Sequence, residues 1–498
     1  MIYSINNGIG WISSGIEFAQ LYRAKVLRNL SKDYKFIYTE FTIDKPMEDF
    51  TSKMGFNNDE VIWLYSFFTD FKYAPTTYTF EELEKTFPQD EYEYSRDGNV
   101  GFIKFNDSCF YKVYFTNDTD NYVFSVEIAS GISVVRRDFY SYAKMFSEYF
   151  GPLDGHAHIY LRRFFNTDGS LAYEEIYDET NSDEVMFRFK DRIINSRNEL
   201  LGYMLSKLNL TKDDYILADR LYECGQAILN NCGDAKVVAM IHAEHFSVEN
   251  TDDEYILWNN YYQYAFMMHK HIAFYVVSTS AQADLLSKQF KKYMNIEPII
   301  KVVPVGSIDE VKYPTNGRKP YSLVTASRLA IEKHIPWMIK ATAIARKTIP
   351  QLTLDIYGSG DQYEECVKAI KDNNAEEFVK LCGYQKMDDI YKDYEAYLSA
   401  SLGEGFGLSL LEAIGSGLPI IGYDVRYGNQ TFVDNEKNGY LFEVKDTMSV
   451  DEKTDILVEG IIKMFTQTDL DKFHEHSYTK ANEFLTKNVE KIMDEAFK

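Results

Sequence analysis

Short apolar runs alternate with helical stretches in two separate series along the chain. Residues 1–41 read as strand, glycine-containing loop, helix and strand, and the same alternation resumes near residue 214. A second series begins at YSLVTASRL, residues 321–329, and continues through LTLDIYGSG, VKLCGY, AYLSASL and PIIGYDV. Such alternation is typical of parallel sheets covered by helices. The pattern therefore predicts an α/β protein with two Rossmann-like lobes.

A block rich in aromatic and β-branched residues interrupts the first series. Runs such as GFIKF, CFYKVYF and YVFSVEI are separated by polar turn clusters, which predicts hairpins and an antiparallel sheet. The sequence leaves open whether this is an ordinary β insertion or a docking surface. We expect a first lobe at 1–44 and 206–312, the β-rich insertion at 45–205, a second lobe at 313–480 and a C-terminal helix at 481–498.

Charge and cysteine content narrow the class of protein. The chain of 498 residues has a formal net charge of -23, which argues against nucleic-acid binding and against tight adsorption on an anionic bilayer. The five cysteines are dispersed without CxxC spacing, so we expect reduced thiols rather than disulfides or a zinc site. The first residues do not resemble a signal peptide, and no run of about 18 apolar residues occurs. We therefore expect a cytoplasmic protein.

The most specific motif is EGFGLSLLE, which places Glu404 and Glu412 eight positions apart. Its glycines let N–H groups at a helix N-terminus approach an anion. If the segment were helical throughout, the two carboxylates would be about 12 Å apart. A glycosidase pair lies within about 10 Å. The wider spacing suits the distance from the sugar to the ribose of a nucleotide-sugar. The alternative interpretation is that Glu404 and Glu412 are two acids without a ligand, beside a buried strand–helix junction.

Arg328 and Lys333 come directly after the apolar strand YSLVTA, in the sequence SRLAIEKH. Two fixed cations at a strand end can hold a diphosphate and neutralise the charge that grows as it leaves. Taken alone, an arginine and a lysine at a strand end are more often surface charges. Their place at the start of the series that contains Glu404 favours the diphosphate.

Two weaker signals lie in the first series. The glycine-containing loop after the first strand leads into a helix whose first residues, Gly15 to Phe18, would present N–H groups to a phosphate or an acceptor. A tight turn without a ligand is the alternative. His242 ends the strand KVVAMI, where ligands of Rossmann-like lobes bind, and it can contact a sugar hydroxyl or serve as a structural histidine. Because HAEH is not HExxH, we do not expect zinc there.

Together these motifs resemble a known family. EGFGLSLLEAIGSGLP, SRLxxEK and the preceding YGSG resemble the retaining GT-B glycosyltransferases of the glycogen-synthase-like family four, whose two Rossmann-like lobes face a cleft. More narrowly, NxGIGWxSSGxExAQxYRA, VIWLYxxFTD, HAEH, PVGSID and YGNQTF resemble the GtfA type of the accessory Sec system, nearly end to end.

The resemblance implies a reaction and its participants. Such enzymes transfer a first sugar, from UDP-N-acetylglucosamine or UDP-glucose, to serine and threonine of serine-rich repeat adhesins before export. They use the UDP-sugar as a co-substrate and need no metal. The resemblance also implies a catalytically silent GtfB-type partner that docks on the β insertion and through which the protein could reach the inner face of the cell membrane.

The resemblance assigns roles to individual residues as well. Arg328 and Lys333 would bind the diphosphate, and Glu404 and His242 would contact the donor sugar; these four are the expected catalytic residues. Glu412 would bind the ribose. The expected donor-binding residues are Gly15, Ile16, Glu17, Phe18, Tyr384, Gln385, Gly405, Phe406, Gly407, Leu408 and Glu412, with Tyr384 and Gln385 beside the uracil. No carboxylate is placed as a nucleophile, so the acceptor hydroxyl would attack from the face that the diphosphate leaves.

Two alternatives remain at this point. One is a transferase that acts on a polyol-phosphate or wall polymer. The other is a non-catalytic partner protein with a degenerate GT-B fold, which the joint presence of Glu404, Glu412, Arg328 and Lys333 disfavours.

Overall fold

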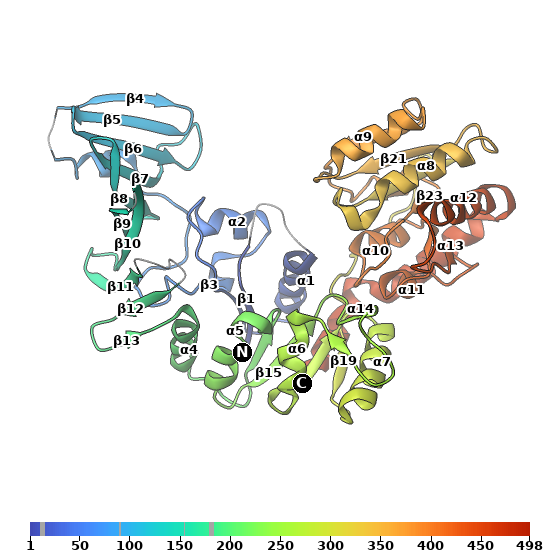
Figure 1. Cartoon of the computed structure of the whole chain (residues 1–498), viewed down its shortest axis with the longest axis horizontal. Coiled ribbons are helices and arrows are strands. Elements are labelled where there is room, and N and C mark those ends of the chain that lie inside the picture. Colours follow the sequence, from blue (N-terminus) through green and yellow to red (C-terminus); the bar gives the residue numbers. More distant parts are fainter. Residues whose placement is uncertain (10–14, 89–90, 154, 179–183) are drawn as a thin grey trace. The chain divides into compact units, whose positions relative to one another are not determined.

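The computed structural model describes residues 1–9, 15–88, 91–153, 155–178 and 184–498, and it contains two compact units (Figure 1). The first unit comprises Met1–Glu17, Lys32–Ala239 and Gln263–Ala273. The second comprises Phe18–Ser31, Met240–Tyr262 and Phe274–Lys498. Helix α1 (Gly15–Asn29) begins in the first unit and continues in the second.

The first unit contains a run of parallel strands. In spatial order these are β15 (Lys236–Ile241), β14 (Tyr215–Ala218), β1 (Ile2–Asn6), β2 (Tyr34–Tyr38) and β3 (Val61–Trp63). The associated helices are α2 (Met47–Lys53), α4 (Arg197–Lys207) and α5 (Leu221–Asn231). Every residue of β1 and β14 is buried, as expected for parallel strands covered on both faces. Because β3 pairs with β2, part of the segment 45–205 lies in this parallel sheet, and the domain limits given above stay a prediction.

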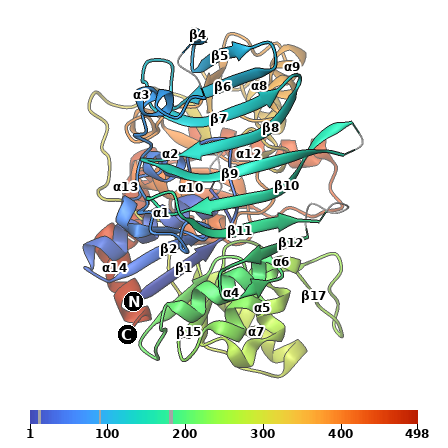
Figure 2. The same cartoon turned by 90° about the vertical axis from the view of Figure 1, so that its left-hand side faces the viewer.

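The predicted antiparallel sheet is confirmed, and each of its strands pairs with its neighbours in sequence (Figure 2). Its strands are β4 (Glu93–Asp97), β5 (Val100–Asn106), β6 (Cys109–Phe115), β7 (Val123–Ser130), β8 (Ser133–Tyr140), β9 (Lys144–Leu153), β10 (His156–Phe165), β11 (Leu171–Tyr177), β12 (Val185–Arg188) and β13 (Ile193–Ile194). The short helix α3 (Phe80–Glu84) precedes them and begins with a capping box at Thr79 and Glu82.

Aromatic rings on one face of this sheet form a continuous column. Phe139 stacks on Phe146 with ring centroids 4.4 Å apart, and Phe164 stacks on Tyr173 at 4.3 Å. These residues are direct cross-strand partners, and such pairs stabilise a sheet. Phe41, from the loop after β2, packs against Phe146 as well. Much of the aromatic content that the sequence leaves open as a docking surface therefore forms the core of this unit.

The second unit is built on a six-stranded parallel sheet. In spatial order its strands are β22 (Val379–Gly383), β21 (Thr353–Tyr357), β20 (Ser322–Ala326), β23 (Ala396–Leu398), β24 (Ile420–Tyr423) and β25 (Gly439–Phe442). The chain adds strands on one side of β20 and then returns to add β23 on the other side. The order therefore reverses between β20 and β23, and ligands of open parallel sheets bind beyond the strand ends at such a switch point.

The helices of the second unit follow these strands. They are α8 (Ile335–Ala345), α9 (Tyr363–Asp372), α10 (Leu408–Gly415), α11 (Gly428–Phe432), α12 (Val450–Gln467), α13 (Leu470–Ala481) and α14 (Thr486–Ala496). The same unit holds the parallel pair β18 (Phe274–Val277) and β19 (Ile300–Val302), with helix α7 (Ser280–Gln289) between them in sequence. In the parts of the chain that the structure describes, no helix has the length and apolar character to cross a membrane.

One predicted helix is shorter than its sequence pattern suggests. The pattern of residues 256–268 predicts a single helix, but Leu257 and Trp258 form strand β17, which pairs with β16 (Phe246–Ser247). Helix α6 (Asn260–Met267) starts only after Asn259, whose side-chain oxygen accepts a hydrogen bond from the N–H of Tyr261 at 3.0 Å. This local cap ends the hairpin and starts the helix.

Candidate functional site

An ion pair lies at the switch point of the second unit. Lys333 ends the 3₁₀ helix η4 (Ile331–Lys333), which follows β20, and Glu404 lies in the loop that follows β23. The Lys333 ammonium donates to the Glu404 carboxylate, and the two side chains are only 19% and 16% exposed. Since β20 and β23 are neighbours, two segments 71 positions apart in sequence meet at one sheet edge. We call Lys333, Glu404 and the residues that hold them the switch-point site.

The backbone around Glu404 is held closely. Its N–H donates to the carbonyl of Arg426 at 2.9 Å, and its own carbonyl accepts from the N–H of Gly428 at 2.9 Å. Gly405 follows, and a Cβ there would lie 2.5 Å from the carbonyl oxygen of His242. Only glycine fits at that position, so the loop after β23 packs directly on the loop after β15.

Helix α10 begins immediately after this loop. Gly407 precedes it with a φ of 86°, a left-handed conformation that glycine adopts without strain. The first N–H groups of a helix have no partner within the helix and favour anions. Phe406 is buried beside Phe432 and Phe484, so its ring is part of the core, and its place at the donor stays a prediction. Leu408 is the first residue of the helix.

Arg328 lies in the loop between β20 and η4. Its guanidinium forms an ion pair with Glu332 at 3.1 Å, and its side chain is 60% exposed. An exposed pair of this kind contributes little to stability, because solvent screens it. The guanidinium can therefore exchange Glu332 for an anionic ligand at low cost.

Glu412 lies on α10, one turn into the helix. The hydroxyl of Tyr391 donates to its carboxylate at 3.3 Å. Burial raises the pKa of Glu412 to about 7, the hydrogen bond from Tyr391 opposes this shift, and the negative charge of Asp388 adds to it. A carboxyl with this pKa titrates near neutrality, and such groups cluster at functional sites.

His242 follows the last residue of β15. Its N–H and that of Ala243 donate to the hydroxyl of Tyr262, at 3.1 and 2.9 Å. The His242 side chain is half-buried. The structure therefore brings the loop of His242 against Gly405, and it leaves the role of the imidazole a prediction.

The remaining predicted donor-binding residues lie in two places. Tyr384 and Gln385 follow β22, and Tyr384 is 77% exposed. Gly15, Ile16, Glu17 and Phe18 form the first turn of α1. The glycine-containing loop before them falls at residues 10–14, outside the described residues.

A separate cavity of about 940 Å³ lies within the first unit. Its walls come from the ends of β1 and β2, the first turn of α1, the antiparallel sheet and the start of α4. The polar and aromatic residues that line it include Asn6, Glu17, Glu40, Phe41, Asp44, Tyr65, Arg162, Tyr177, Arg197, Asn198, Arg220 and Glu223. We call it the Arg162 cavity. Both acidic and basic groups line it, so it offers donors and acceptors to a polar ligand.

Arg162 fixes one wall of this cavity. It is only 4% exposed, its guanidinium binds the carboxylates of Glu148 and Glu175, and it lies 3.6 Å from the centroid of the Phe41 ring. Glu148 and Glu175 are buried too. A buried cation is tolerated when its charge and hydrogen bonds are satisfied in this way, and the arrangement holds its partners rigidly.

Sequence reasoning missed several of these residues. The side chain of Tyr427 contacts those of Glu244 and His245 beside the Glu404 loop. HAEH and YGNQTF stand out as motifs, but no local sequence pattern shows that their residues meet. The Arg162 cavity is assembled from segments that are far apart in the sequence and has no contiguous signal. Among the described residues there is no group of three or more His, Cys, Asp and Glu side chains that could hold a metal ion.

Comparisons with known proteins agree with this geometry. Residues 91–191 match the family model of the GtfA extended beta-sheet domain, and residues 308–464 match that of glycosyl transferases group 1. The chain is 45% identical to the GtfA subunit of a UDP-N-acetylglucosamine--peptide N-acetylglucosaminyltransferase from Streptococcus agalactiae, over 98% of this chain and 96% of that protein.

Two solved structures are similar over the whole chain. One is the pneumococcal O-GlcNAc transferase GtfA in complex with UDP and GlcNAc, with a TM-score of 0.92 and 39% identity over 100% of this chain and 98% of that one. The other is a chain of a GtfA/B complex, with a TM-score of 0.95 and 41% identity over the same shares. These matches confirm the predicted GT-B class, and they show that the chain belongs to the GtfA family of glycosyltransferases.

Proposed function

We propose that the protein is a retaining transferase that moves N-acetylglucosamine or glucose from a UDP-sugar to serine and threonine hydroxyls of a serine-rich repeat adhesin. The observation that carries this proposal is the Lys333–Glu404 pair at the switch point, directly before the N-terminus of α10. A cation, a carboxylate and helix N–H groups at one sheet edge suit a sugar diphosphate. The names of the GtfA relatives, which specify UDP-N-acetylglucosamine and a peptide, support the choice of donor and acceptor.

Each donor group then has a proposed contact. Arg328 and Lys333 bind the diphosphate, Glu404 and the backbone of Gly405 to Leu408 hold the sugar, and Glu412 binds the ribose. Tyr384, whose ring is exposed beyond β22, and Gln385 lie beside the uracil. His242 contacts the sugar from the loop that packs on Gly405.

The chemistry needs stabilisation of the leaving group more than a nucleophile from the protein. As the bond from the anomeric carbon to the phosphate oxygen breaks, negative charge grows on the diphosphate, and Arg328, Lys333 and the α10 amides stabilise it. The acceptor hydroxyl attacks from the same face, and its proton passes to the departing phosphate oxygen. The anomeric configuration is thereby retained, and the two cations take the role that a metal ion has in other transferases.

We assign the acceptor to the Arg162 cavity. Its volume of about 940 Å³ and its mixed acidic and basic walls suit an extended peptide rich in hydroxyl groups. The rigid wall at Arg162 would present a fixed surface to such a peptide. Ile16 and Glu17, in the first turn of α1, line this cavity too.

A GtfB-type partner completes the proposal, as the GtfA/B complex of a similar chain suggests. On the outer part of the antiparallel sheet, Phe102, 48% exposed, lies beside a hollow of about 510 Å³, and Tyr94, 44% exposed, lies on the opposite face against Phe80. Exposed aromatic rings favour interfaces. Replacing both residues by serine should weaken co-elution with the partner on gel filtration and leave UDP binding intact.

We place the reaction in the cytoplasm, with any attachment to the membrane made through the partner, because a net charge of -23 disfavours direct adsorption.

The proposal is tested by incubating the protein and its partner with a serine-rich repeat peptide and each UDP-sugar, followed by mass measurement of the peptide. A gain of one hexose or one N-acetylhexosamine per modified residue is expected with one of the two donors. Modification of a polyol-phosphate polymer but not of the peptide would favour the wall-polymer alternative. Absence of both transfer and donor hydrolysis would favour the non-catalytic one.

A further inference from the structure

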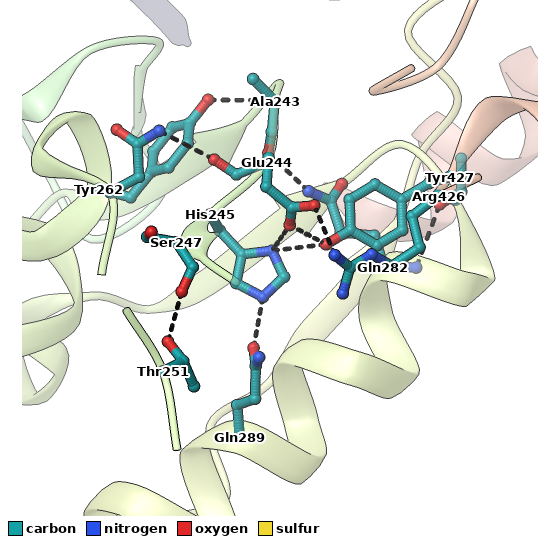
Figure 3. A network of polar contacts seen from close by, with 12 residues as sticks. Ala243, Glu244, His245, Ser247, Thr251, Tyr262, Gln282, Gln289, Arg426 and Tyr427 are labelled. Carbon is teal, nitrogen blue, oxygen red and sulfur yellow. Dashed lines mark hydrogen bonds and ion pairs between the residues drawn. The ribbon is translucent and has the colours of Figure 1, made fainter. Parts of the chain in front are cut away.

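A buried chain of side-chain contacts joins the loop after β15 to the loop after β24 in the second unit (Figure 3). We propose that Tyr427, held by Glu244 and His245, is a positioning residue that fixes Glu404 and Gly405 for the donor sugar. This inference rests on the proposed function, because it assigns Glu404 to the sugar of the donor. We call Gln289, His245, Tyr427, Glu244 and Arg426 the Tyr427 relay.

The contacts of the relay run without interruption. The Tyr427 hydroxyl contacts the Glu244 carboxylate and lies 3.2 Å from Nδ1 of His245. On the other side of the imidazole, Nε2 lies 2.6 Å from Oε1 of Gln289 on α7. Glu244 in turn forms an ion pair with Arg426 at 3.3 Å. Figure 3 shows His245 between Tyr427 and Gln289, with Arg426 beside Glu244.

The relay is buried at its centre. His245 is fully buried and Tyr427 is only 1% exposed, and their rings stack with centroids 6.0 Å apart. Burial lowers the pKa of His245 to about 4, so the imidazole is neutral at physiological pH. Burial and the charge of Glu244 also raise the pKa of Tyr427 above its ordinary value, so its hydroxyl keeps its proton. A polar group this deeply buried is costly unless its hydrogen bonds are specific.

The backbone on both sides of the Tyr427 ring holds Glu404. The N–H of Tyr427 donates to the Glu404 carbonyl at 2.6 Å, and the N–H of Glu404 donates to the Arg426 carbonyl at 2.9 Å. A Cβ at Gly428 would overlap the carbonyl oxygen of Phe406, so the backbone segments around Glu404 and Tyr427 are in direct contact. Any movement of Tyr427 is therefore passed to Glu404 and Gly405.

The same relay holds the loop on which Gly405 packs. Glu244 and His245 follow His242 and Ala243 directly, and the Ala243 carbonyl accepts from Nε2 of Gln282 on α7 at 2.9 Å. Tyr427 thus joins the two loops that meet at Gly405 and the His242 carbonyl. Arg328 and Glu412, which are assigned to the diphosphate and the ribose, pair with Glu332 and Tyr391 outside this relay, and Lys333 meets it only through the side chain of Glu404. Loss of the relay should consequently weaken the contacts to the donor sugar and leave the binding of UDP unchanged.

The test is the variant Tyr427→Phe, which keeps the ring and removes the hydroxyl. Loss of one hydrogen bond to a charged group should lower kcat/KM for the UDP-sugar about 10- to 100-fold. The Kd for UDP alone, measured by calorimetry, should change by less than about twofold, since the UDP contacts are untouched. This split between sugar and UDP is a readout that general destabilisation would not produce.

A matched control is Tyr423→Phe. Tyr423 is equally buried on β24, and its hydroxyl donates to the carbonyl of Lys453 at 2.9 Å, outside the relay. A second variant, Glu244→Gln, keeps the shape of a side chain that is 38% exposed and removes the charge that Tyr427 contacts. The effects of Tyr427→Phe and Glu244→Gln should not add in the double variant, because both act through one contact.

The outcomes separate the two claims. If the wild-type protein turns over the UDP-sugar and Tyr427→Phe has the same kcat/KM as Tyr423→Phe, the relay is excluded and the proposed function stands. The same holds if Tyr427→Phe weakens UDP binding as much as it lowers kcat/KM for the UDP-sugar. Additive effects of the two relay variants would also overturn the relay. A wild-type protein with its partner that turns over no UDP-sugar would contradict the proposed function, and the assignment of the relay with it.

Discussion

The switch-point site and the Arg162 cavity are built in different ways. At the switch-point site, backbone packs on backbone, and Gly405 and Gly407 permit contacts that other residues would block. At the Arg162 cavity, large side chains from distant segments form the walls, and a buried guanidinium shared by two carboxylates holds them together. The first arrangement brings a few loops into close contact at one sheet edge, and the second encloses a larger volume. Close contacts at the first site therefore depend on glycine in the backbone, whereas the walls of the second depend on how large side chains pack in the tertiary fold.

The largest effect is expected at the Arg162 cavity. Arg162→Met removes the buried cation closest to Glu148 and Glu175, which keep only longer ion pairs with Arg137 at 3.7 Å and Arg197 at 3.6 Å. Breaking a buried pair in this way costs about 3 to 5 kcal/mol. Denaturant unfolding should show this loss in the first unit. The control is Arg163→Met, whose side chain is 42% exposed and which should cost about 1 kcal/mol or less. Equal losses for the two variants would show that Arg162 does not organise the cavity.

The next effect is expected at the switch-point site. Lys333→Ala or Arg328→Ala should lower turnover about 100-fold or more, because each removes a side chain that is proposed to donate to the leaving diphosphate. The variants should unfold like the wild type. Lys340→Ala removes an exposed ion pair with Asp451 on the same unit and serves as the control. Wild-type rates in the Lys333 and Arg328 variants would exclude their role in the reaction.

A smaller effect concerns Glu412 and has a defined pH dependence. Its folded-state pKa of about 7 lies above the ordinary 4.5, so the folded protein binds more protons between these values and loses stability as pH rises through them. Glu412→Gln should therefore stabilise the ligand-free protein by about 3 kcal/mol at pH 8 and by less than about 1 kcal/mol at pH 5. Thermal unfolding at the two pH values measures this. A gain that is the same at both would mean that burial does not disfavour the Glu412 charge.

The smallest effect is expected from chelation. Because Arg328 and Lys333 are proposed to neutralise the diphosphate, EDTA should leave the transfer rate unchanged. The measurement compares rates with and without EDTA, followed by addition of magnesium or manganese. Loss of activity that a divalent ion restores would show that a metal shares the role given to the two cations.

The two regions also differ in how far the sequence predicts them. The strand ends at His242, Arg328 and Glu404 follow from apolar runs whose residues are buried on both faces. Gly407 at the start of α10 follows from the glycine pattern. Side-chain partners do not follow, because the Lys333–Glu404 pair depends on which strands become neighbours in the sheet.

The residues missed by sequence reasoning share one physical cause. Tyr427 and His245 are 182 positions apart, and Arg162 and Phe41 meet only after the antiparallel sheet packs on the loop after β2. No local periodicity encodes such contacts. The sequence assigns the residues of β3 to the insertion for a similar reason. A strand of only three residues has too little hydrophobic pattern to predict that it pairs with β2.

The central claim is that the switch-point site binds the donor and the Arg162 cavity binds the acceptor. The most direct measurement is the affinity of the protein with its partner for UDP and for a serine-rich peptide, in the variants Lys333→Ala and Tyr177→Ala. Lys333→Ala should weaken UDP binding at least about tenfold and spare peptide binding, because the proposed contact of one charged group to phosphate is lost. Tyr177→Ala, which alters the cavity wall beside Arg162, should weaken the peptide and spare UDP. Loss of UDP binding in Tyr177→Ala with unchanged peptide binding would contradict the account.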